Sequence, residues 1–215
     1  MGTTDPPDIR AEHLRRVEVD RLEARIVLED VLIESASLSG ADAGSVRLER
    51  ADLKDVDLSN ARLRAIRLTD VTAERIDAAN GDWGGGELRR VHLQDARLTG
   101  LDLSEARIEQ VSFKGCKLDY VNFRHSKIGH VLFEDCVLRG ADFQGAEIDA
   151  TRFARCQLVE ADFTKAEISS VDLRGSELAL AGSLLGLSGA IIDSLQLMDV
   201  ARTLAHELGI TVEDA

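Results

Sequence analysis

Three cysteines lie twenty residues apart, and thiols at a regular spacing can hold a metal ion or form a disulfide. They are Cys116, Cys136 and Cys156. Zinc requires ligands that converge at about 2.3 Å, and a disulfide requires Cβ atoms about 3.8 Å apart. If residues twenty apart stack at the usual strand spacing of ~4.8 Å, the three thiols run parallel and do not converge. We therefore predict small apolar core residues here, with neither a metal nor a cofactor bound.

A second series with the same spacing is acidic, which could indicate a calcium site or a pair of catalytic carboxylates. It consists of Asp42, Asp82, Asp102, Asp142 and Asp162, with Asn122 among them. Short Asp and Asn side chains bond readily to nearby backbone groups at turns. The amide of Asn122 serves that purpose as well as a carboxylate does, so we predict structural turn residues.

No other group of residues has a spacing typical of an enzyme. His125 and His130 have no nucleophile in register with them, and the sequence contains no HExxH motif. The run Gly84–Gly86 lacks the lysine and serine of a phosphate-binding loop. We therefore expect a non-enzymatic protein with no catalytic residues, no cofactor-binding residues and no metal ligands.

A period of five governs the elements that position these residues. From Leu28 to Leu178 every fifth residue is apolar or small, and a second small residue commonly stands two positions earlier. This period fits neither an α-helix, which repeats every 3.6 residues, nor a β-strand, which repeats every 2 residues. It indicates a repeat architecture.

A second period, of twenty residues, is superimposed on the period of five. Among the inward positions that recur every five residues, those twenty residues apart have the same residue type. Two separate phenylalanine series run from Phe113 to Phe153 and from Phe123 to Phe163. Residue n is therefore expected to contact residue n+20, which gives four pentapeptides per coil. The two phenylalanine series then lie on opposite walls. The run of fifth positions makes a little under eight coils, or a rod roughly 37 Å long.

The motif Ala-Asp-Leu/Phe recurs at 51–53, 141–143 and 161–163 and resembles the pentapeptide-repeat proteins over roughly residues 22–182. The resemblance implies an all-β solenoid: a right-handed, four-sided parallel β-helix of about eight coils, closed by a C-terminal capping α-helix. We divide the chain into an N-terminal cap segment (1–21), the pentapeptide-repeat β-helix (22–182), and the final coil, C-terminal helix and tail (183–215). A short capping helix is expected over residues 8–16.

The repeat is poor over residues 79–87. Trp83 occupies an inward position that elsewhere in its series holds Ala, Leu or Phe, and Gly84–Gly86 follow it. We expect a local distortion here. The segment is either a coil of small residues or a loop that exposes Trp83 as a contact residue.

The register slips by one residue after Leu178, and a helix is predicted from about Leu195 to Leu208. Asp193 and Gln196 fit the N-cap and N3 positions of a capping box, and Gly209 fits the C′ position.

One face of this helix is apolar and could serve either as a lid on the last coil or as a dimer contact. Its residues are Leu197, Ala201, Leu204 and Leu208. Known members of the resembled family often form homodimers through this end. A second candidate contact is the least charged face of the rod, where Tyr120, Val137 and Val159 point outward within three successive coils.

The formal net charge of −13 disfavours direct binding to nucleic acid or to an anionic membrane. Each outward face nets −2, so the rod carries about a third of the linear charge of B-DNA. Several proteins of the resembled family mimic DNA, bind DNA gyrase or another type II topoisomerase, and give protection from quinolones. The most specific hypothesis is this function, and the alternative is a general protein-binding scaffold with no topoisomerase role.

No stretch reaches the ~20 apolar residues of a membrane span, and the N-terminus lacks the apolar core of a secretory signal. Three cysteines is an odd number, which does not favour a disulfide framework. We expect a cytoplasmic protein.

Overall fold

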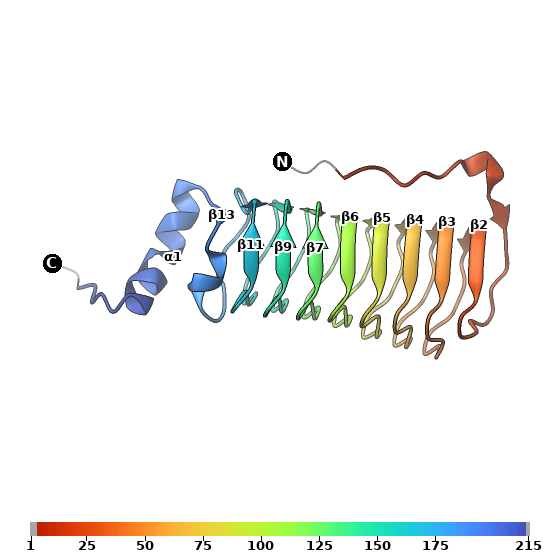
Figure 1. Cartoon of the computed structure of the whole chain (residues 1–215), viewed down its shortest axis with the longest axis horizontal. Helices are drawn as coiled ribbons and strands as arrows, with labels where there is room; N and C mark the ends of the chain where they lie inside the picture. The colour runs from red at the N-terminus through yellow and green to blue at the C-terminus, as the bar shows by residue number, and fades with distance from the viewer. Residues whose placement is uncertain (1–3, 214–215) are drawn as a thin grey trace.

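The computed structural model describes residues 4–213, which form a rod of parallel strands stacked along one axis (Figure 1). One 13-stranded sheet wraps around the rod in about nine turns. Within the described residues the only α-helix is α1 (Ser194–Glu207), at the C-terminal end. The predicted all-β solenoid with a C-terminal helix is confirmed, with one coil more than the five-residue register alone contains.

The strands occupy two adjacent faces of the rod. In the N-terminal half each strand turns a corner without a break, and in the C-terminal half it divides into two. The first group is β2 (Val27–Glu34), β3 (Arg47–Lys54), β4 (Arg67–Glu74), β5 (Glu87–Gln94) and β6 (Arg107–Lys114). The second group is β7 (Lys127–Gly129), β8 (Leu132–Glu134), β9 (Glu147–Asp149), β10 (Arg152–Ala154), β11 (Glu167–Ser169) and β12 (Val171–Asp172).

Pairing between coils follows the twenty-residue period. Leu48 pairs with Leu68 in the ladder between β3 and β4. The other two faces are joined by single bridges, such as that between Asp42 and Arg62. Four faces per coil, with residue n beside residue n+20, confirm the nested periods. The corners between faces hold residues in the left-handed region, including Asn60 at φ 57°, a conformation that Asn, Asp and Gly adopt at least cost.

The interior is filled by stacked side chains of one type. Phe113 stacks on Phe133 with ring centroids 4.8 Å apart, and Phe123 stacks on Phe143 at the same spacing. The two stacks meet edge to face, since the rings of Phe123 and Phe133 are 6.2 Å apart at 82°. The predicted placement of the two phenylalanine series on opposite walls is confirmed.

The expected distortion over residues 79–87 is wrong. Trp83 is buried, with 1% of its surface exposed, and the Gly85 N–H donates to the Ser104 carbonyl at 2.8 Å in an unbroken coil. The indole fits because Ala73 and Ala78 fill other inward positions of the same coil with very small side chains. A large residue among small neighbours keeps the core volume constant, which well-packed interiors tolerate best.

The predicted slip of one residue at the C-terminal end is confirmed. Val171 of β12 pairs with Ala190 of β13 (Ala190–Ile191), and Asp162 pairs with Ala181, nineteen residues on in both cases. Between these bridges lies the 3-10 helix η2 (Leu184–Leu187).

The predicted capping box of α1 is confirmed. Asp193 Oδ1 accepts the N–H groups of Leu195 and Gln196 at 2.9 and 3.0 Å, and Gln196 Oε1 accepts the Asp193 N–H at 2.9 Å. Gly209, at φ 73°, follows the helix in the left-handed conformation typical of a C′ glycine.

Of the two alternatives for the apolar helix face, the lid on the last coil is wrong apart from Leu204, and the dimer contact stays a prediction. The packed face consists of Gln196, Val200 and the half-buried Leu204, whereas Leu197, Ala201 and Leu208 are exposed. Hydrogen bonds to the last coil explain this orientation of the helix. Gln196 Nε2 donates to the Leu173 and Ser176 carbonyls of the last coil, both at 2.7 Å, and these two bonds fix the rotation of the helix about its axis.

The expected capping helix over residues 8–16 is also wrong. This stretch holds one 3-10 turn, η1 (Ala11–His13), and a two-residue strand, β1 (Arg15–Arg16), which pairs with Val31 and Leu32 of β2. Before η1, residues 4–10 run back along the outside of the rod (Figure 1).

Candidate interaction surfaces

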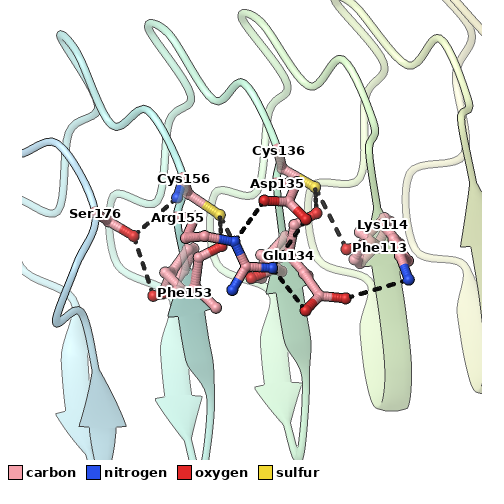
Figure 2. A network of polar contacts seen from close by, with 11 residues as sticks. Phe113, Lys114, Glu134, Asp135, Cys136, Phe153, Arg155, Cys156 and Ser176 are labelled. Carbon is pink, nitrogen blue, oxygen red and sulfur yellow. Dashed lines mark hydrogen bonds and ion pairs between the residues drawn. The ribbon is translucent and has the colours of Figure 1, made fainter.

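The cysteine series lies inside the rod, as predicted. Each thiol donates to two backbone carbonyls; Cys136 Sγ, for example, lies 3.3 Å from both the Phe113 and the Glu134 oxygens (Figure 2). Ser176 continues the series, and its hydroxyl donates to the Phe153 carbonyl at 3.0 Å. Contact with the two neighbouring thiols, together with burial, raises the pKa of Cys136. The central thiol therefore stays protonated and is not a nucleophile.

The acidic series makes turns, as predicted. Oδ1 of Asp102, Asp142 and Asp162 accepts the backbone N–H two residues further on, at 2.8 to 3.0 Å. Asp82 and Asn122 make the same bond at 3.0 Å. Asp42 differs, because its carboxylate is held by Arg62 at 2.9 Å.

Ion pairs hold nearly all carboxylates in the N-terminal part of the rod. Arginines of one coil reach carboxylates of the coil before, with Arg50 Nε 2.6 Å from Asp30 and Arg75 Nε 2.7 Å from Asp55. Between residues 27 and 75, all of which the structure describes, Asp57 is the one carboxylate without an ion-pair partner. Similar ladders continue to Arg155, which joins Asp135 and Glu134 (Figure 2).

Carboxylates without an ion-pair partner are concentrated toward the C-terminal end of the rod. Within the fully described stretch 145–178 there are five of them: Asp149, Glu160, Asp162, Glu167 and Glu177. Lys165 is the one cation of that stretch without a partner among the described residues. The net charge itself is not graded, because this stretch has seven carboxylates against four cations and residues 27–75 have ten against seven, which is −3 in both cases. The two stretches differ in how many carboxylates are paired.

The apolar contact proposed at Tyr120 is partly exposed. Tyr120 is 60% exposed, whereas Val137 and Val159 are half-buried. The tyrosine ring lies over Gly140 of the next coil, where an added Cβ would come within 2.6 Å of the ring. The three residues occupy adjacent coils of one face, with Val159 accepting the Gly140 N–H at 2.8 Å.

A larger apolar surface lies at the C-terminal end. Its exposed residues are Leu185, Leu195, Leu197, Met198, Leu208, Ile210 and Val212. Between η2 and α1 an apolar pocket of about 280 Å³ is lined by residues including Leu187, Ile192 and Leu204. Sequence reasoning identified Leu197 and Leu208, with Met198 beside them, but missed Leu185 and Leu195 as contact residues, although the run Leu184–Leu187 is an apolar signal. By contrast, Trp83 is buried and cannot act as the predicted loop contact.

No helix among residues 4–213 is long and apolar enough to cross a membrane. The same residues contain no cluster of three or more His, Cys, Asp or Glu side chains placed to hold a metal ion.

Two family models match the chain. One, described as a pentapeptide repeat region, matches residues 86–163 and 106–181, and the other, described as eight copies of pentapeptide repeats, matches residues 34–70. Curated proteins give no match.

Among solved structures, the chain is similar to HetL, a pentapeptide repeat protein involved in heterocyst differentiation regulation in the cyanobacterium Nostoc sp. strain PCC 7120. The identity is 23% over 81% of this chain and 92% of HetL, with a TM-score of 0.48. It is also similar to QnrB1, a plasmid-mediated fluoroquinolone resistance protein. A trypsin-treated form is 18% identical over 93% of this chain and 98% of that one, with a TM-score of 0.48. Full-length QnrB1 is 20% identical over 92% of this chain and 99% of QnrB1, with a TM-score of 0.39.

Proposed function

The chain belongs to the pentapeptide-repeat family, and from that premise we propose that it is a non-enzymatic protein-interaction module whose partner is DNA gyrase or a related type II topoisomerase. In this proposal the rod occupies the groove that otherwise grips DNA and so gives protection from quinolones. The observation that carries the proposal is the concentration of unpaired carboxylates in the C-terminal half of the rod.

Whether a carboxylate can imitate a DNA phosphate depends on whether it is held in an ion pair, and this differs along the rod. Carboxylates in tight ion pairs, such as Asp30 and Asp55, present little net field to a partner, whereas Glu160, Glu167 and Glu177 retain theirs. Uncompensated charge steers an oppositely charged partner and raises the association rate. The stretch 145–178, where unpaired carboxylates are concentrated, is therefore the part that a DNA-binding saddle would meet.

A homodimer through the C-terminal end would place the two stretches rich in unpaired carboxylates end to end, near the centre of one long particle. The exposed apolar residues of α1, among them Leu197 and Met198, supply a surface suited to such a contact. The dimer would extend the negative rod to about twice its length. We include the dimer in the proposed function.

The proposal is tested by gyrase supercoiling assays with and without a quinolone. The test variant neutralises Asp149, Glu160, Glu167 and Glu177 to Asn or Gln, and the matched control neutralises Glu23, Glu29, Asp55 and Glu74, which are ion-paired. Both variants change the net charge by the same amount. We expect the unmodified chain and the control to inhibit supercoiling or protect it from the drug at micromolar concentration, and the test variant to act at least tenfold more weakly.

The alternative function, a general protein-binding scaffold with no topoisomerase role, predicts a different outcome. The apolar face at Tyr120 and the C-terminal surface favour protein contacts without requiring negative charge. Absence of both inhibition and protection by the unmodified chain would therefore favour the scaffold over the gyrase proposal.

A further inference from the structure

The N-terminal segment is docked along the rod as an extended strap, defined here as residues 4–10 (Figure 1). Two hydrogen bonds attach it to two different coils. The Asp8 N–H donates to Asp70 Oδ1 at 3.0 Å, and Gln110 Nε2 donates to Asp5 Oδ2 at 2.7 Å. Asp70 and Gln110 are forty residues apart in one exterior column, so the strap crosses two coils lengthwise.

A comparison of two equivalent ion pairs shows that the strap covers its site. Asp30–Arg50 and Asp70–Arg90 occupy the same column, one pair outside the path of the strap and one beneath it. The side chains of the first pair are 42% and 39% exposed, and those of the second are 10% and 22% exposed. Burial alone would raise the pKa of Asp70, but the hydrogen bonds from Arg90 and the Asp8 N–H hold it below its usual value.

The surface beneath and beside the strap is locally positive on a strongly negative protein. Over residues 67–130 the outward positions of this face hold five cations, Arg67, Arg89, Arg90, Arg107 and Lys127, against the three carboxylates Asp70, Glu87 and Glu109. Among the described residues, Arg89 and Arg107 have no ion-pair partner and are exposed. The strap meets this patch with two carboxylates of its own, on Asp5 and Asp8.

The positive patch ends near the Asp5 contact. Beyond it lies a groove of about 590 Å³ in which Arg107, Lys127 and His130 share the lining with the carboxylates Glu109, Glu147, Asp149 and Glu167. Gly129 helps to open it, because this position of the strand has no side chain where the preceding coil has Glu109.

We propose that this face is a docking site for an extended acidic segment of a partner protein and that the strap occupies the site as a built-in competitor. The strap shows which chemistry the site accepts: an extended backbone with carboxylates three residues apart, of which the Asp5 carboxylate accepts from Gln110 and the Asp8 residue donates its N–H to Asp70. A partner segment of the same kind binds along Arg89, Arg90 and Arg107 and displaces the strap. This site, beside the strap, contains none of the carboxylates that the gyrase test neutralises, so it stands or falls independently of gyrase binding.

The test uses the full-length chain and a fluorescent peptide with the sequence of residues 4–13. In one variant Asp5→Lys and Asp8→Lys reverse the charge of the strap and release it from the face. Fluorescence anisotropy is expected to show that this variant binds the peptide at least tenfold more tightly than the unmodified chain does. Adding Arg89→Gln and Arg107→Gln is expected to reduce that affinity at least fivefold, while adding Arg50→Gln, in the same column but outside the strap, leaves it unchanged.

Amide hydrogen exchange on the unmodified chain provides the second measurement. The Asp8 amide is expected to be protected, and the Lys variant is expected to lose this protection. Unprotected strap amides in the unmodified chain, or equal peptide affinity for both chains, would overturn the proposal. Tighter binding of a DNA oligonucleotide than of the peptide by the Lys variant would overturn the assignment to an acidic polypeptide.

Discussion

At the scale of single residues, the thiols and carboxylates that could have formed a reactive site instead stabilise the coils. The thiol of Cys136 and the carboxylate of Asp102 both bond to backbone groups of their own or adjacent coils. Their spacing of twenty made this role predictable from the sequence, because a functional site needs convergent groups and a stacked column supplies parallel ones. What the spacing could not reveal is which carboxylates remain unpaired, since that depends on the reach of arginines one coil away.

Trp83 gives a prediction about packing. Its indole Nε1 is buried and has no hydrogen-bond partner among residues 4–213, so the ring contributes through volume alone. Trp83→Ala is expected to reduce the free energy of unfolding by about 3 to 5 kcal/mol, and Trp83→Phe by about 1 kcal/mol or less, because the phenyl ring loses no satisfied hydrogen bond. Urea unfolding of both variants measures the two values. Equal costs for Ala and Phe would contradict the packing account.

His92 gives a prediction about pH. Burial lowers the pKa of His92 from 6.5, and no described residue bonds to its buried Nε2. A histidine whose pKa is lower in the folded state contributes its full stability above pH 6.5 and loses it as the pH falls toward the folded value. Thermal unfolding is therefore expected to show lower stability at pH 5.5 than at pH 7.5, and His92→Thr to show a smaller difference. An unchanged difference in His92→Thr would contradict this role.

At the scale of elements, sequence patterns predicted the coils and the capped helix α1, but not how the terminal segments pack on the rod. The ladders of β2 to β6 repeat one environment many times, so every turn reinforces the same interpretation. The helix α1 occurs once, and its rotation is set by the two hydrogen bonds of Gln196 to the last coil. The strap has no periodic apolar pattern, because its hydrogen bonds come from Asp5 and Asp8 and only Pro7 and Ile9 are half-buried apolar residues.

The two faces of α1 have separate roles that substitution can separate. Leu197→Asp, on the exposed face, is expected to leave stability within about 0.5 kcal/mol of the unmodified chain and to convert a dimer to a monomer. Val200→Asp, on the buried face, is expected to cost several kcal/mol because it buries a charge without a partner. Sedimentation velocity and urea unfolding measure the two effects. A folded Leu197→Asp protein with an unchanged oligomeric state would rule out the dimer contact.

At the scale of the whole molecule, the ion pairs are unevenly distributed along the rod. A sum over each face gives the same −2 everywhere, whereas carboxylates without an ion-pair partner are concentrated over residues 145–178, next to the apolar end. The proposed function assigns the gyrase contact to this stretch. The strap lies outside this stretch, so the rod presents two surfaces of opposite local charge.

Competition with DNA tests the proposed function most directly. Fluorescently labelled chain is titrated with purified gyrase, and duplex DNA is then added at increasing concentration and constant salt. The account predicts binding at micromolar gyrase and complete displacement of the chain by DNA, with at least tenfold weaker binding when Asp149, Glu160, Glu167 and Glu177 are neutralised. Absence of binding, or binding that DNA does not displace, would contradict it.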